Sequence, residues 1–267
     1  NFFGRPTLVD RGSSRKETYR QQFEAWARIL PGHFWRPNAG SPAGWQQGLP
    51  DIHIAQTIRD FKDVAAANCL GIFIDSVWEH WATAGPLYYI MAQLAWNPGA
   101  DAQAILTDYY QRAFGPAAAD VRAYFEFIEK ERMAFNARLP DAEEFDFAQL
   151  YTPEWLATAQ GHLDRAAAAA PAPSIHAQRV AFIRVGLEYT RLLAENIRLM
   201  ARFWGSNDRS VTDRVKQNWA AMEKLAASTP YAINWGPVRP TTPRMAGLHP
   251  DSKPPKKKPA RAAELDQ

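Results

Sequence analysis

Two carboxylates, Asp75 and Glu79, follow a short apolar segment, 70–74 (LGIFI), that we expect to be a buried strand. Glu79 lies between Trp78 and His80. A strand that ends on an acid in an aromatic loop is the arrangement that many α/β-barrel enzymes use at their catalytic face. In glycoside hydrolysis, one acid protonates the leaving oxygen while a second carboxylate acts as nucleophile or activates water. The pattern makes Asp75 the first candidate for a catalytic or substrate-positioning acid and Glu79 the second.

A second group of polar and aromatic residues follows the preceding apolar segment, 33–35. The guanidinium of Arg36 can hold a carboxylate or a pair of hydroxyls, and the amide of Asn38 can bond sugar hydroxyls. Trp35 and Trp78 are candidate stacking platforms for a sugar ring, and His80 flanks the same cleft. We therefore expect these five side chains to contact substrate.

Each of these residues also has a purely structural interpretation. Asp75 can cap a loop or helix, and Glu79 can be a surface charge. The sequence Arg36-Pro37-Asn38 is also typical of a turn after a strand. A single Trp more often fills a core than lines a cleft. The sequence leaves both interpretations open at every one of these positions.

Other chemistries lack their motifs in the sequence. His33 and His80 have no second His or Cys at a metal-ligand spacing, which argues against zinc. The sequence contains no phosphate-binding loop, no dinucleotide glycine motif and no Gly-x-Ser-x-Gly elbow. We expect no metal and no cofactor.

The elements around the candidate site alternate in type over roughly the first 98 residues. We expect helices over 16–30 and 52–67 and strands over 33–35 and 70–74, with Asp51 as the cap of the second helix. That alternation is typical of parallel βα units. A complete eightfold barrel needs roughly 200 to 250 residues. The sequence therefore predicts the last two or three βα units of a truncated TIM-type (β/α)8 barrel, and the start at Asn1 rather than Met favours truncation.

From Pro86 onward the pattern is helical throughout. The expected helices, joined by short connections, cover 87–96, 101–114, 116–139, 152–170, 175–204 and 210–227. Such spacing predicts an antiparallel bundle. The fold class is therefore α/β followed by all-α, with a partial barrel over 1–98, a helical domain over 99–235 and a disordered tail over 236–267.

Charge and composition exclude several classes of partner. The chain has 267 residues and a net charge of +3 at pH 7. Its last 32 residues hold seven Lys/Arg and three Asp/Glu, so the remainder is nearly neutral and does not predict nucleic-acid binding. No apolar run approaches the ~18 residues of a membrane span. The single cysteine, Cys69, excludes an internal disulfide.

A family resemblance rests on five short stretches: Gly71-Ile72-Phe73, 85–92 (GPLYYIMA), 94–98 (LAWNP), Asp108-Tyr109-Tyr110 and 114–117 (FGPA). Together they resemble a bacterial domain-of-unknown-function family related to α-glucuronidase-like and hexosaminidase-like glycosidases. The resemblance covers about residues 23–127. It implies a (β/α)8 barrel followed by a helical region, a carbohydrate substrate and an extracellular or periplasmic location. It also implies a glutamate near the strand end, where this chain has Asp75.

We expect the C-terminal part of a glycoside hydrolase-like protein that cleaves a polysaccharide or a uronic-acid-containing glycan, and that is inactive without the rest of its barrel. The alternative is a non-catalytic glycan-binding or scaffolding module whose helices form an interaction surface. A weaker alternative is a small helical regulator with a basic tail.

Overall fold

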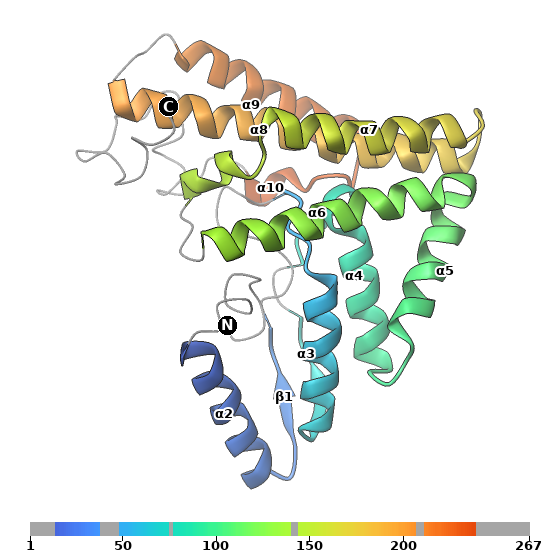
Figure 1. Ribbon diagram of the computed structural model, residues 1–267, viewed down its shortest axis with the longest axis vertical. Helices are drawn as coiled ribbons and strands as arrows, with labels where there is room; N and C mark the ends of the chain where they lie inside the picture. The colour runs from blue at the N-terminus through green and yellow to red at the C-terminus, as the bar shows by residue number, and fades with distance from the viewer. Residues whose placement is uncertain (1–13, 38–47, 75–76, 140–143, 207–210, 239–267) are drawn as a thin grey trace.

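A computed structural model describes residues 14–37, 48–74, 77–139, 144–206 and 211–238 (Figure 1). Within these ranges the chain is mostly helical and has two strands. The strands are β1 (His33–Trp35) and β2 (Cys69–Ile72). The helices are α2 (Ser14–Ile29), α3 (Ile54–Ala66), α4 (Trp81–Trp96), α5 (Ala102–Phe114), α6 (Ala118–Arg138), α7 (Pro153–Ala169), α8 (Ile175–Ser206), α9 (Val211–Ser228) and α10 (Trp235–Val238), with 3-10 turns η2 (Gly115–Ala117) and η3 (Glu144–Gln149).

The two strands form a parallel pair connected through α3. Phe34 is in register with Gly71, and Trp35 with Ile72. Helix α3 packs against β2, so the segment is one βαβ unit. A Cβ atom at Gly71 would lie 2.7 Å from the Phe34 ring, so only glycine allows this cross-strand approach. The predicted alternation of parallel βα elements is confirmed, but two strands do not close a barrel, and the part of the chain that the structure describes contains no others.

Helix α3 begins two residues later than expected and is not capped by Asp51. Its buried face consists of Ile54, Thr57, Phe61 and Val64, at spacings of three and four. The N–H of Ala55 is bound instead by Glu129 of α6, at 2.8 Å. The prediction that Asp51 caps this helix was wrong, because its carboxylate forms an ion pair with a residue of another helix.

That ion pair joins the start of the βαβ unit to the helical region. Asp51 accepts a hydrogen bond from Nε of Arg132 at 2.7 Å, and both side chains are buried. Arg132 also donates to the side chain of Asn136. The hydroxyl of Tyr151 donates to the Pro50 carbonyl at 3.1 Å, next to the pair in sequence. Segment 50–51 is therefore held in place by groups from α6 and from Tyr151, two residues after η3.

Local signals set the ends of the helices in the second half of the chain. The Asp101 carboxylate accepts from the N–H groups of Gln103 and Ala104, as expected for an N-cap. Gly115 ends α5 with a φ of 50°, a conformation that favours glycine. Thr152 caps α7 through a bond from the Trp155 N–H at 3.2 Å. These boundaries agree with the sequence prediction.

The helical region is layered and is not a simple antiparallel bundle. In Figure 1, the axes of α3, α4 and α5 are roughly upright, and α6 to α9 lie across them. Helix α8 contacts α4, α5, α7 and α9. Short connections determine which helices are neighbours but not the angle at which they cross, because side-chain packing sets that angle. None of the helices in the described ranges combines the length and apolarity required to cross a membrane.

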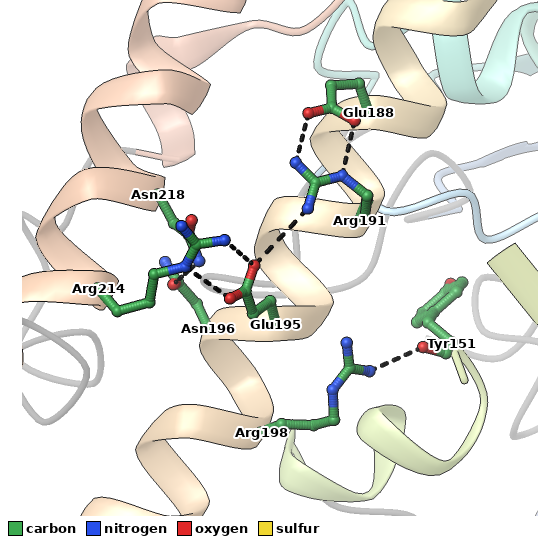
Figure 2. Close-up of polar contacts among 8 residues, drawn as sticks. All are labelled: Tyr151, Glu188, Arg191, Glu195, Asn196, Arg198, Arg214 and Asn218. Carbon is green, nitrogen blue, oxygen red and sulfur yellow. Dashed lines mark hydrogen bonds and ion pairs between the residues drawn. The ribbon is translucent and has the colours of Figure 1, made fainter. Parts of the chain in front are cut away.

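Charged side chains on α8 form ion pairs within the helix and contacts with neighbouring elements (Figure 2). Arg191 forms a two-fold contact with Glu188, and Arg214 of α9 forms another with Glu195. Arg198 donates to the Tyr151 carbonyl at 3.0 Å. Several arginines on one helix face are typical of a surface exposed to solvent. Here Arg184 and Arg198 of α8 instead bind residues outside the helix.

Candidate functional site

The structure describes five of the seven candidate site residues. Asp75 and Asn38 lie outside the described residues, and their roles stay predictions. The described ones are Trp35, Arg36, Trp78, Glu79 and His80. Trp35 ends β1 and Arg36 follows it, whereas Trp78, Glu79 and His80 lie on the loop directly before α4.

The exit of β1 lies beside the exit of β2. The N–H of Phe73 donates to the Trp35 carbonyl at 2.9 Å. The guanidinium carbon of Arg36 lies over the Phe73 ring, 5.5 Å from its centroid. Phe73 precedes Asp75 by two residues, so Arg36 is brought to the strand end that carries the first candidate acid.

Trp35 occupies a core position. Its side chain is 7% exposed and packs edge-on against Phe61 of α3, with ring centroids 5.3 Å apart. The indole therefore helps to hold α3 on the sheet. Trp78 differs from it, because 38% of its surface is exposed on the loop before α4.

Glu79 has an unusual backbone in the middle of this loop. Its φ is 60°, in the left-handed region that few residues other than glycine adopt. Its side chain is exposed. Non-glycine residues held in this region are often found where a site imposes the conformation. The side chain of Glu79 is thus open to solvent, and in sequence it lies between Trp78 and Trp81.

His80 is buried and links the loop to a distant part of the chain. Its Nδ1 accepts a hydrogen bond from the N–H of Asn234 at 3.1 Å, so the neutral ring carries its proton on Nε2. Burial lowers the pKa of His80 from 6.5 to about 4. Nε2 is buried and has no hydrogen-bond partner among the described residues. His80 is therefore a neutral structural link near pH 7.

Segment 229–234 completes the surroundings of the loop. The carbonyls of Tyr231 and Ala232 accept from the N–H groups of Trp81 and Ala82, each at 3.1 Å. These bonds satisfy donors of the first turn of α4, which has no side-chain cap. They explain why α4 begins at Trp81, whereas the sequence predicts a start near 87. No local signal reveals this contact, because about 150 residues separate the two segments.

Tyr88 of α4 contacts loop 77–81 through its side chain. It is buried, and its hydroxyl bonds backbone groups of His80 and Trp78. Burial raises the pKa of Tyr88 to about 12, so the hydroxyl remains protonated. The ring packs edge-on against Trp81, with centroids 5.2 Å apart. The loop is thus held from α4 on one side and from segment 229–234 on the other.

The described part of this site contains groups that can pack on apolar surfaces and form hydrogen bonds. It offers half-exposed aromatic rings, one carboxylate and, at the neighbouring strand exit, one guanidinium. Within the described ranges, no group of three or more His, Cys, Asp or Glu is placed to hold a metal ion. Grooves of about 460 Å³ between α2 and α3 and about 520 Å³ beside α6 and α7 are lined by other residues.

Comparisons with known proteins give one family match. No curated protein and no solved structure matches the chain. The expected resemblance to a domain-of-unknown-function family is confirmed for the part of the chain that holds the βαβ unit and loop 77–81. Residues 10–126 match the model of the family described as Domain of unknown function (DUF4838).

Proposed function

We propose that this chain is the C-terminal part of a glycoside hydrolase-like protein that cleaves glycosidic bonds in a polysaccharide or a uronic-acid-containing glycan. The observation that carries the proposal is loop 77–81, which follows parallel strand β2 and exposes Glu79 together with Trp78 and Trp81. Aromatic rings can cover the apolar face of a sugar, and carboxylates bond its hydroxyls or move its protons.

We further propose that β1 and β2 continue into a larger parallel sheet of the (β/α)8 type. Parallel strands are found almost only in sheets that are covered on both faces. Trp35 is covered by α3, but Phe34, on the opposite face, is 75% exposed, and Leu70 of β2 is 67% exposed. A sheet with apolar residues on both faces and one face uncovered is the pattern expected for the edge of a larger sheet.

In this proposal Asp75 is the acid that protonates the leaving glycosidic oxygen or positions the substrate. A second carboxylate, Glu79 or one from another strand, attacks the sugar carbon or removes a proton from the attacking water. The C–O bond to the leaving group breaks as it gains the proton. Arg36 and Asn38 bind substrate carboxylate or hydroxyl groups, and Trp78 packs on a ring.

Hydrolysis can be tested on the full-length protein with a panel of 4-nitrophenyl glycosides and glucuronides and with reducing-end release from glucuronoxylan. Asp75→Asn is expected to lower turnover by about 10²–10⁴-fold without changing the fold. Asp108→Asn is the matched control, because Asp108 is an exposed acid on α5 that forms an ion pair with Arg112 of the same helix. Equal activity of wild type and Asp75→Asn would remove Asp75 from the site.

A non-catalytic glycan-binding module is the second candidate. It is favoured by the exposed rings of Trp78 and Trp81, because aromatic rings can pack on a sugar without any chemical step. Binding of oligosaccharides without product release from any substrate of the panel would select this function over hydrolysis.

A further inference from the structure

We infer that segment 229–234 forms one wall of the carbohydrate site at loop 77–81, and that Tyr231 presents its ring to a sugar there. This inference rests on the proposed carbohydrate function and assigns a contact residue outside the matched family segment. Tyr231 comes from the stretch between α9 and α10, about 150 residues after the loop.

Three backbone-level contacts fix the wall against the loop. Trp81 and Ala82 donate their N–H groups to the carbonyls of Tyr231 and Ala232. In the opposite direction, the N–H of Asn234 donates to Nδ1 of His80. The contacts join three consecutive loop residues to three residues of the segment, so the backbone of Tyr231 is held beside that of Trp81.

Both segments have a residue with an unusual backbone conformation at this contact. Three non-glycine residues of the described chain have a positive φ, and two of them are Glu79 and Tyr231, at 60° and 66°. Each is the residue that turns its segment beside the contact. The tertiary contacts over-determine both conformations, which is the situation in which strained residues persist at binding sites.

Three exposed aromatic residues lie at this backbone contact or close to it in sequence. Trp78, Trp81 and Tyr231 are 38%, 40% and 67% exposed. None is charged, and Glu79 lies between the two tryptophans in sequence. A pyranose ring has an apolar C–H face that packs on aromatic rings and a rim of hydroxyls that a carboxylate accepts. The chemical class that fits is therefore a pyranose unit of an oligosaccharide.

His80 positions the wall and does not bind the sugar. Its imidazole is buried. The ring can accept the hydrogen bond from the N–H of Asn234 only while Nδ1 is unprotonated. Its role predicts that substitutions at position 80 act through the placement of Tyr231.

The test is titration calorimetry of the full-length protein with defined probes, namely cello-, manno- and chito-oligosaccharides and aldouronic acids from glucuronoxylan. Tyr231→Asn removes the ring and keeps a residue that tolerates a positive φ. We expect it to weaken binding of the best probe by about tenfold. Tyr231→Phe should bind within about twofold of wild type, because stacking needs the ring rather than the hydroxyl.

Trp96→Ala is the matched control. Trp96 is the most exposed large aromatic of the described chain, at 90%, and lies at the opposite end of α4 from Trp81. It should leave affinity unchanged. Thermal unfolding of each variant reports whether the fold is kept.

The outcomes separate this inference from the proposed function. If Trp78→Ala weakens binding while Tyr231→Asn binds as wild type does, the inference is overturned and the carbohydrate function stands. Loss of binding in Tyr231→Phe as well would overturn stacking as the role of the residue. If wild type binds none of the probes, both the function and the inference fail.

Discussion

Apolar side chains are covered in the helical region, α4 to α9, and left open in the βαβ region, α2 to β2. In the helical region, Tyr124 of α6 and Leu163 of α7 are 0% exposed. Trp96 is the largest exception there. In the βαβ region, Phe34 and Leu70 of the strands and Ile29 of α2 are mostly exposed.

The difference follows from how each element presents its apolar residues. A helix concentrates them on one stripe, which one neighbouring layer can cover. A parallel strand presents them on both faces, so it needs a layer on each side. Helices α4 to α9 cover one another, whereas α3 covers a single face of the two strands. The helical region is therefore stable through its own contacts, and the βαβ region gains stability from its attachment to that region.

Breaking the attachment is the change with the largest expected effect. Arg132→Met leaves the carboxylate of Asp51 buried without its partner, and removal of one member of a buried pair typically costs about 3–5 kcal/mol. The free energy of unfolding from urea titration measures it. Arg112→Met is the matched control, since Arg112 forms an exposed pair with Asp108.

Replacing Asp51 by Leu together with Arg132→Met should restore much of the lost stability, because no unpaired charge remains. If Arg132→Met and Arg112→Met have the same effect, the ion pair does not join the two regions.

The contrast in burial is tested directly by truncating one side chain in each region. Leu163→Ala should lower the free energy of unfolding by about 2–5 kcal/mol, because it leaves a cavity in a closed core. Phe34→Ala should change it by about 0.5 kcal/mol, because most of the ring is already in water. Equal losses in urea titrations would mean that the strand face is covered in solution.

The helical elements were predictable because their signals are local. Asp101, Gly115 and Thr152 mark helix ends within one turn of the residues that they cap. The parallel βα alternation was predictable for the same reason. Asp51 also looks like a cap, but Arg132 lies 81 residues away and no local pattern predicts that it will bind this carboxylate.

The candidate site was predictable in part. An apolar strand that ends in an aromatic loop identified Trp78, Glu79 and His80, and Arg36 lies where a neighbouring strand exit should place it. Trp35 has the same composition signal, yet α3 covers it. The contact with Tyr231 was not predictable, because backbone hydrogen bonds between distant segments do not require particular residue types.

His80 makes the link between loop 77–81 and segment 229–234 sensitive to pH. Its pKa is about 4 in the folded state and 6.5 in the unfolded chain, so the unfolded chain binds a proton at pH values where the folded state does not. Stability from this group is complete above pH 6.5 and falls as the pH drops toward 4, by about 3 kcal/mol in total.

Urea titrations of wild type and His80→Gln between pH 7 and 4 isolate the effect, because the difference between them removes the carboxylates that both share. Wild type should lose stability faster than the variant on acidification. Parallel pH curves would show that His80 is accessible to protons in the folded state.

The smallest effect is expected from the charged contacts on α8. Arg191 and Glu188 are joined by two hydrogen bonds, at 2.8 and 2.6 Å, and both side chains are nearly half exposed (Figure 2). Water and salt screen such a pair, so a double-mutant cycle with Arg191→Ala and Glu188→Ala should give a coupling energy of about 0.5 kcal/mol. The coupling should shrink further in about 1 M NaCl, where the Debye length is about 3 Å. A coupling above about 2 kcal/mol would instead make charge pairing, rather than apolar packing, the property that distinguishes the helical region from the βαβ region.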